Sequence, residues 1–201
     1  MQRMRGNKIY AKLSKCDFNS PEVEFLGHIV GREGIKVDPA KIAVVRDWPL
    51  LQSTSEIRQF LRLANYFRKF IQGYSSLAAP LTILLAGKDK AVMLNNNNNN
   101  RRLVTLVMLN ALQIDTFEAI IHALTNAPVL IPPDLSKPFE VVSDASLLGT
   151  GAVLLQDGKP IAYSSSKFIP AERNFTTGEQ ELLGVFKTLK EWRWKVVNAL
   201  W

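Results

Sequence analysis

The sequence predicts an α/β (α+β) chain in which a helical first half precedes a mixed sheet with one helix. A strongly amphipathic helix begins at Ser53, and a run of six asparagines, Asn95–Asn100, separates two halves of different composition. The last third contains three consecutive strands joined by short turns and followed by a helix. Of the 201 residues, 47% are apolar and 21% are charged, which is close to average globular composition and argues against wholesale disorder.

Residues 8–48 predict short β elements followed by a helix. Val23–Val30 is typical of a strand, Gly31–Gly34 of a turn and Ile35–Val37 of a second short strand. Asp38, which a proline follows, is a favourable N-cap for the helix. That helix must end before Pro49, because the residue before a proline is held out of α geometry.

The clearest helix begins with the capping box Ser53-x-x-Glu56. Apolar residues recur on one face of it at i, i+3, i+4 spacing: Ile57, Phe60, Leu61, Ala64, Phe67 and Ile71. At about 100° per residue, polar and basic residues cluster within roughly 60° on the opposite face: Arg58, Arg62, Asn65 and Lys69. This face is either an ordinary solvated surface or a nucleic-acid contact, and the absence of an acidic partner after Glu56 favours the contact.

The middle of the chain predicts a linker, a helix and a connector. Asn95–Asn100 is low-complexity sequence without a core-forming pattern, so we expect a loop or linker there. Leu103–Leu112 is apolar without clean periodicity, whereas the spacing of apolar residues from Phe117 onward predicts a helix that ends near Asn126. Three prolines then predict an extended connector: Pro128, Pro132 and Pro133.

The last third predicts the antiparallel start of a mixed sheet. Phe139–Ser143 is rich in β-forming residues, and we expect Asp144 to end that strand. Gly151–Leu155 predicts the second strand, Asp157-Gly158 a hairpin turn, and Pro160–Ser164 the third strand.

A helix is expected to follow the sheet, capped by Thr177-x-x-Gln180. Its apolar positions are Leu182, Val185, Phe186, Leu189, Trp192 and Val196.

The net charge of +7 is unevenly distributed. Residues 1–90 hold fifteen Lys and Arg against eight Asp and Glu, whereas residues 137–201 hold eight against seven. A basic first half beside a nearly neutral second half indicates either a polyanion-binding module or simply a soluble basic surface.

Composition also excludes several classes of protein. One cysteine, Cys16, excludes an internal disulfide framework, and with only His28 and His122 beside it a Cys/His zinc site is excluded as well. No stretch reaches the roughly eighteen apolar residues of a membrane span, and no secretory signal is evident. We therefore expect an intracellular protein, cytoplasmic or nuclear, without a membrane partner or an evident small-molecule substrate.

Asp144 and Glu181 are the candidate catalytic pair. An acid on a strand and another acid early in the following helix can supply hard oxygen ligands to Mg²⁺, provided that the helix packs across the strand that carries Asp144. Two such ions polarise a phosphodiester, activate water and stabilise the leaving oxygen. Such pairs also occur by chance in any αβ domain. No histidine lies in this third of the chain, so a serine triad is excluded.

Taken together, the motifs resemble the Pol polyproteins of gypsy-type LTR retrotransposons. They occur in that family's order and spacing and cover nearly the whole chain except about 88–115. The segments that carry the resemblance are Lys15–Phe18, Phe25–His28, Gly34–Lys41, Trp48-Pro49, Phe60–Ile71, Ala127–Leu130, Ser143–Ser146, Gly151–Leu154, Glu172–Phe175 and Glu179–Leu183.

The resemblance implies a division of the chain into four parts. Residues 1–48 would be the end of a reverse-transcriptase palm, 49–90 a helical thumb, 91–136 a connector with the Asn-rich linker, and 137–201 the N-terminal part of a ribonuclease H-like domain with a truncated mixed sheet.

The resemblance also implies roles for particular residues. Asp144 and Glu181 would be catalytic metal ligands in a two-ion Mg²⁺ site. Residues 25–29 would lie beside the primer grip, with His28 as a packing residue. The basic face of Arg58, Arg62, Asn65 and Lys69 would bind an RNA–DNA hybrid or a DNA duplex.

The chain departs from the family pattern in three ways. The polymerase aspartates of the "YxDD" motif and the later ribonuclease H carboxylates are not in these 201 residues, and 88–115 does not follow the family pattern. We therefore expect a fragment of a reverse transcriptase/ribonuclease H that binds nucleic acid and is inactive alone. The alternative is a co-opted or degenerate non-catalytic nucleic-acid-binding protein.

Overall fold

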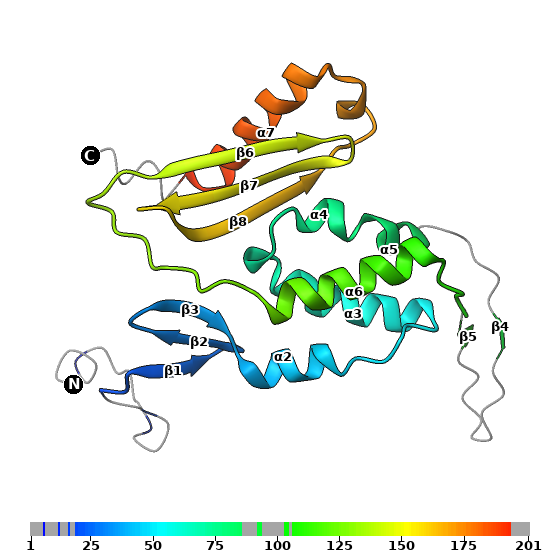
Figure 1. Ribbon diagram of the computed structural model, residues 1–201, viewed down its shortest axis with the longest axis horizontal. Helices are drawn as coiled ribbons and strands as arrows, with labels where there is room; N and C mark the ends of the chain where they lie inside the picture. Colours follow the sequence, from blue (N-terminus) through cyan, green and yellow to red (C-terminus); the bar gives the residue numbers. More distant parts are fainter. Residues whose placement is uncertain are drawn as a thin grey trace.

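The computed structural model describes residues 19–85 and 106–193, together with Gly6, Lys12, Cys16 and the backbone of two short strands, β4 (Val92–Met93) and β5 (Leu103–Val104). The chain forms an α/β (α+β) structure with two three-stranded antiparallel sheets and helices between and beside them (Figure 1). The linker expected at Asn95–Asn100 lies outside the described residues. Within the described residues, no helix combines the length and apolar character needed to cross a membrane.

The first sheet is an antiparallel meander of β1 (Glu22–Phe25), β2 (His28–Gly31) and β3 (Gly34–Val37). The prediction of a single strand over Val23–Val30 was wrong, because a tight turn at Leu26-Gly27 splits it. Both turn residues have positive φ, 50° at Leu26 and 72° at Gly27. Glycine tolerates this conformation, but a leucine rarely adopts it. The apolar Leu26 is therefore not a residue from which a turn would be predicted.

Helices α2 (Pro39–Arg46) and α3 (Thr54–Tyr66) begin at the expected caps. The Asp38 side chain accepts a hydrogen bond from the Ala40 backbone, and Ser53 accepts one from the Glu56 backbone. Glu56, however, accepts from the backbone N–H of Gln52 rather than from that of Ser53, so only half of the expected capping box forms.

Helix α3 is shorter than its apolar pattern indicates. It ends at Tyr66 and is followed by the 3₁₀ turn η2 (Arg68–Phe70) and two short helices, α4 (Tyr74–Leu77) and α5 (Ala79–Leu84). All six apolar residues expected on the buried face are nevertheless buried, including Phe67 and Ile71 beyond the end of the helix. The chain thus keeps the core contacts while it changes direction.

Helix α6 (Ala111–Thr125) completes the larger hydrophobic core. It begins at a full capping box formed by Asn110 and Gln113, and it ends at Asn126 as predicted. After it, the extended connector pairs with the first sheet through reciprocal backbone hydrogen bonds between Ile35 and Leu130.

The second sheet consists of β6 (Glu140–Ser146), β7 (Gly149–Gln156) and β8 (Lys159–Lys167), all antiparallel. The hairpin turn falls at Asp157-Gly158 as predicted, with positive φ at both residues. Asp144 does not end its strand, however, because β6 continues through Ser146.

Beyond this sheet the 3₁₀ turn η3 (Glu172–Asn174) leads into α7 (Thr177–Glu191). The cap of α7 lies one residue earlier than expected, since Thr176 pairs with Glu179 in a capping box.

Helix α7 packs on the sheet through small side chains rather than through its apolar residues. Gly184 and Thr188 are buried, and a methyl group at Gly184 would lie only 3.1 Å from Thr150 Cγ2, so helix and sheet approach closely here. Trp192 is buried in the smaller core. Four of the apolar positions read from the sequence are exposed instead: Leu182, Val185, Phe186 and Leu189. The last apolar position of that pattern, Val196, lies outside the described residues.

The sheet β6–β8 lies between two layers of helix. Helix α7 covers one face, and the segment with α4 lies against the other (Figure 1). At the second contact the Ser75 backbone donates to Ser165 Oγ at 2.9 Å, and the Ser76 and Ser146 hydroxyls lie 3.2 Å apart. This contact fixes which face of the sheet meets the helical half.

His28 is a buried histidine whose Nδ1 has no hydrogen-bond partner in the part of the chain that the structure describes. It stacks on Tyr66, with ring centroids 5.6 Å apart, and contacts the rings of Phe67 and Phe70. Burial and the positive charge of Lys69 lower the pKa of His28 below 6.5. The residue is thus a neutral packing residue, which agrees with the role expected from the resemblance.

We predict that His28 makes the stability of the chain depend on pH. Because the folded pKa is lowered, the unfolded chain binds more protons between the two pKa values, and stability is lost as pH falls from about 6.5 through the folded pKa. One such proton changes the free energy of unfolding by at most about 1.4 kcal/mol per pH unit. Urea unfolding of the parent and of His28→Phe at pH 7.5 and 5 should show a smaller loss in the variant. An equal loss in both would contradict this account.

Candidate functional site

The two faces of sheet β6–β8 can be assigned from paired residues. Thr150 meets Gly184 of α7, whereas a methyl group at the neighbouring Gly151 would lie 3.6 Å from Gly73 Cα. Residues paired directly across antiparallel strands share a face, and Asp144 pairs with Gly151. Asp144 therefore faces the α4 side of the sheet, and α7 lies on the other side.

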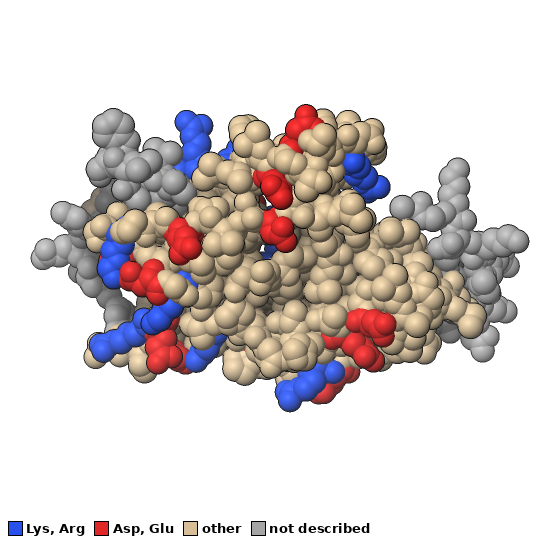
Figure 2. Space-filling view, turned by 45° about the horizontal axis from the view of Figure 1, so that its top comes forward, with Lys and Arg blue, Asp and Glu red and all other residues tan. Residues whose placement is uncertain are grey.

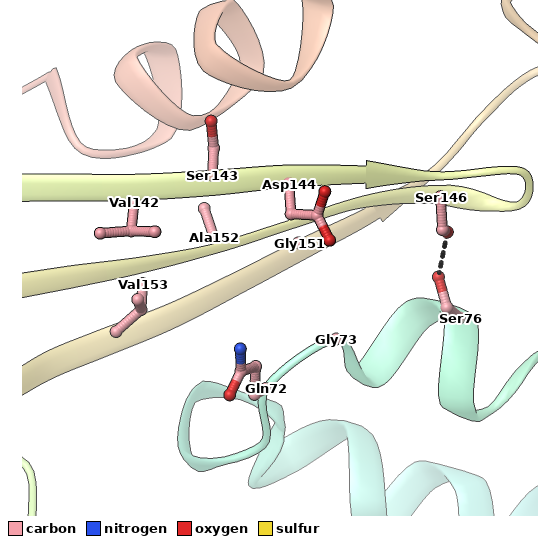
Figure 3. Close-up of a pocket in the computed structure, with 10 residues that line it drawn as sticks. All are labelled: Gln72, Gly73, Ser76, Val142, Ser143, Asp144, Ser146, Gly151, Ala152 and Val153. Carbon is pink, nitrogen blue, oxygen red and sulfur yellow. Dashed lines mark hydrogen bonds between the residues drawn. The ribbon is translucent and has the colours of Figure 1, made fainter. Parts of the chain in front are cut away.

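A cavity of about 200 Å³ lies on the α4 side of the sheet. Figure 3 shows the Ser143 side chain directed toward α7 and the Asp144 side chain directed away from it. Gln72 and Ser76 line the same cavity as Asp144. Asp144 is exposed and is the sole carboxylate among the residues that line the cavity. The other polar side chains there are amide and hydroxyl groups: Gln72, Ser76 and Ser146.

Glu181 does not line the cavity that contains Asp144. It is exposed in the N-terminal half of α7, the helix that covers the face opposite to Asp144. Helix α7 does pack against β6, as the prediction required. Side chains along a strand alternate between the two faces of the sheet, however, and the Asp144 side chain lies on the face that α7 does not cover. The structure thus does not bring the two carboxylates together on one face.

These residues do not fit a two-ion Mg²⁺ site. Mg²⁺ needs near-octahedral oxygen coordination, and two ions need several carboxylates at one point. Within the described residues no group of three or more His, Cys, Asp or Glu side chains could hold a metal ion. The assignment of Asp144 and Glu181 as metal ligands rests on the resemblance alone.

The basic face of α3 divides into two parts. Arg58, Arg62 and Asn65 are exposed on the helix. Lys69 lies beyond the helix end, in η2, where its ammonium group is 5.3 Å from the centre of the Phe70 ring and burial lowers its pKa. Because α3 ends at Tyr66, Lys69 does not continue the row that the periodicity indicated.

The three exposed residues of α3 line a groove of about 470 Å³ together with Lys167 at the end of β8. We call this the basic groove; its cationic side chains are Arg58, Arg62 and Lys167. No acidic side chain lines it, and within the described part of the chain none of these cations forms an ion pair.

Lys167 was missed by sequence analysis. It lies in a strand far from α3 in the chain, and no local pattern relates the two. The strand that holds it was expected to end at Ser164, three residues too early. Burial and the neighbouring Arg173 both lower the pKa of Lys167.

On the face in Figure 2, acidic and basic groups are interspersed on largely uncharged surface. The basic groove differs from that face because all of its charged side chains are positive.

Comparison with known proteins identifies the class. Residues 109–199 match the family model described as "RNase H-like domain found in reverse transcriptase". Residues 140–191 of that match include the sheet β6–β8 and α7.

The resemblance to gypsy-type LTR retrotransposon Pol polyproteins is confirmed. The chain is 35% identical over 172 residues to the Pol polyprotein of transposon gypsy and 36% identical over 183 residues to that of transposon 297, both from Drosophila melanogaster. These matches cover 85% and 90% of the chain but only 16% of each relative. The Tf2-3 polyprotein of Schizosaccharomyces pombe is 32% identical over 198 residues, 96% of the chain and 14% of that relative. The chain therefore spans about one sixth of the length of these relatives.

Solved structures support the same class. A foamy viral protease-reverse transcriptase, described as "dRH in complex with ds DNA", is 25% identical with a TM-score of 0.69, over 87% of this chain and 29% of that one. The foamy viral protease-reverse transcriptase in complex with RNA/DNA hybrid has the same fold over 92% of this chain and 23% of that one, with a TM-score of 0.74 and 24% identity.

We predict that Mg²⁺ does not bind Asp144 and Glu181 as a pair. Since the two carboxylates lie on different sides of the sheet, each should bind the ion weakly and independently. In an NMR titration with MgCl₂, the amides near Asp144 and near Glu181 should shift without a shared saturation point. Asp144→Asn should leave the shifts near Glu181 unchanged. A single saturable transition at both positions, lost in either Asp144→Asn or Glu181→Gln, would contradict the geometry.

Proposed function

We propose that this chain is a reverse transcriptase/ribonuclease H segment that binds an RNA–DNA hybrid or a DNA duplex through phosphate contacts and does not cut it by itself. In this proposal residues 1–48 are the end of the palm, 49–90 the thumb, 91–136 the connector and 137–201 the first part of the ribonuclease H-like domain. The chain's similarity to Pol polyproteins supports the proposal.

The observation that carries the proposal is the one-signed basic groove. Arg58 and Arg62 are exposed, point from one helix into the groove and have no acidic partner among the described residues. Arginine binds phosphate through several parallel hydrogen bonds, and contacts of this kind hold a nucleic acid without reading its sequence. Asn65 can add a hydrogen bond beside them.

The foamy viral relatives support the choice of ligand. Their structures contain ds DNA and RNA/DNA hybrid. An enzyme of this class follows a duplex along its length, so contacts to the phosphate backbone suit it better than contacts to bases.

The arrangement at Asp144 supports the absence of cutting in this proposal. Hydrolysis by a two-ion mechanism requires carboxylates that converge on the scissile phosphate. Asp144 is the sole carboxylate at its cavity, and the segment containing Gln72 and Ser76 lies over that face of the sheet. Magnesium-dependent endonuclease and nucleotidyltransferase activities therefore belong to the longer polyprotein in this proposal.

The alternative is a degenerate or co-opted non-catalytic binding protein, and the same lone carboxylate favours it. Hybrid cleavage distinguishes the two when the 201 residues are compared with a longer chain that includes the downstream sequence. Cleavage by the longer chain, lost in Asp144→Asn, supports the enzyme segment, whereas its absence from both supports the alternative.

We predict that Arg58 and Arg62 account for much of the salt dependence of binding. Each phosphate contact contributes about 0.9 to the slope of log affinity against log salt for a duplex, so Arg58→Glu with Arg62→Glu should lower the slope by about two. Fluorescence anisotropy with a labelled hybrid at 50 to 300 mM KCl measures the slope.

A charge-matched control is available outside the groove. Lys159→Glu with Lys190→Glu changes the net charge equally at two exposed positions on β8 and α7. This variant should keep the parent slope. If both double variants lose the same slope, general charge rather than the α3 face explains the binding.

A further inference from the structure

The basic groove has two walls that come from different parts of the chain. One wall is the exposed face of α3, with Arg58, Arg62 and Asn65. The other includes Lys167, the last residue of β8 in the second sheet. The space between them, about 470 Å³, is open along part of its length and is lined in between by α4 and α5.

The packing of the sheet on α4 determines where Lys167 lies. Ser165 accepts a hydrogen bond from the Ser75 backbone, so its side chain faces the helical half. Side chains two apart in a strand share a face, so Lys167 faces the same way, and it lines the groove together with Ser75 and Thr82.

The electrostatics of the groove favour an anion. Lys167 is partly buried, and within the described residues it has no carboxylate partner. Arg173 adds a further positive charge nearby, which together with burial lowers the pKa of Lys167. A partly desolvated cation among other cations is stabilised when an anion binds.

The remaining groups in the groove suit a sugar-phosphate backbone rather than a stacked base. Tyr74 is buried, its hydroxyl donates to the Leu61 carbonyl, and burial raises its pKa to about 12. The hydroxyl of Thr82 likewise donates to the Ala78 carbonyl. The groove therefore offers cations and an amide, with no free aromatic face for a base.

We propose that Lys167 is a further nucleic-acid-binding residue, which holds the phosphate backbone of the same strand that Arg58 and Arg62 contact. Binding then spans the helical half and the ribonuclease H-like sheet, and one strand of the duplex crosses the junction between them. This inference rests on the proposed function, because it assumes that the α3 wall of the groove contacts nucleic acid. An acidic peptide is the competing occupant.

The test compares Lys167→Glu with Lys159→Glu in the same 201-residue chain. Both lysines lie on β8, at opposite ends of the strand, and Lys159 does not line the groove. With a labelled RNA–DNA hybrid, Lys167→Glu should lower the salt slope by about one and weaken binding at low salt, whereas Lys159→Glu should match the parent. Lys167→Arg should keep the slope.

Thermal unfolding of each variant checks that the sheet is intact. If Lys167→Glu does not fold, Lys167→Gln removes the charge without adding an acid and should lower the slope by the same amount.

The outcomes separate this inference from the proposed function. If Lys167→Glu and Lys167→Gln both keep the parent slope while the α3 double variant loses it, the role of Lys167 is overturned and the proposed function stands. If the parent shows no salt-dependent binding to hybrid or duplex, the proposed function fails. Displacement of the hybrid by polyglutamate at equal charge concentration would identify an acidic peptide as the occupant and overturn the inference.

Discussion

The contact between the second sheet and the segment around α4 determines the rest of the arrangement. It consists of small groups: Gly151 lies against Gly73, Ser165 accepts from the Ser75 backbone, and the hydroxyls of Ser76 and Ser146 meet. Because these groups are small, the sheet approaches the helical half closely and in one register. A methyl group at Gly151 would lie 3.6 Å from Gly73 Cα, which is an ordinary van der Waals contact, so a larger side chain would have to fit against this backbone.

Both candidate sites follow from this contact. It turns Asp144 toward Gln72 and Ser76, away from the helix that carries Glu181. The same face of the sheet carries Lys167, which lines the groove together with residues of α3. The arrangement thus places Asp144 and Glu181, which the family resemblance pairs, on different sides of the sheet. It also brings residues of α3 and β8 together into one basic groove, although these residues lie far apart in the sequence.

Local signals in the sequence predicted most of the elements. The caps at Asp38 and Ser53 begin helices, and the hairpin at Asp157-Gly158 joins two strands as expected. The failures have physical causes. Leu26 adopts a left-handed conformation that its side chain disfavours, so the first hairpin was read as one strand.

Contacts between distant parts of the chain were harder to predict from the sequence than local structure. Helix α7 presents Gly184 to the sheet rather than its leucines, because close approach to Thr150 leaves no room for a larger side chain. The α3 face was predicted correctly at Arg58 and Arg62, but the chain turns after Tyr66 and removes Lys69 from the row. Lys167 replaces it in the groove, and only the tertiary contact places it there. Periodicity identifies the face of one helix, whereas a groove between two elements depends on how they pack.

The contact itself can be tested directly by disulfide trapping. The hydroxyl oxygens of Ser76 and Ser146 lie 3.2 Å apart, so cysteines at both positions, in a chain with Cys16→Ser, are close enough to form a disulfide with modest adjustment. Under mild oxidation at low protein concentration, we expect rapid intramolecular cross-linking and unchanged salt-dependent binding to hybrid. A dithiol that stays reduced, or a cross-linked chain that no longer binds, would contradict the arrangement on which both sites depend.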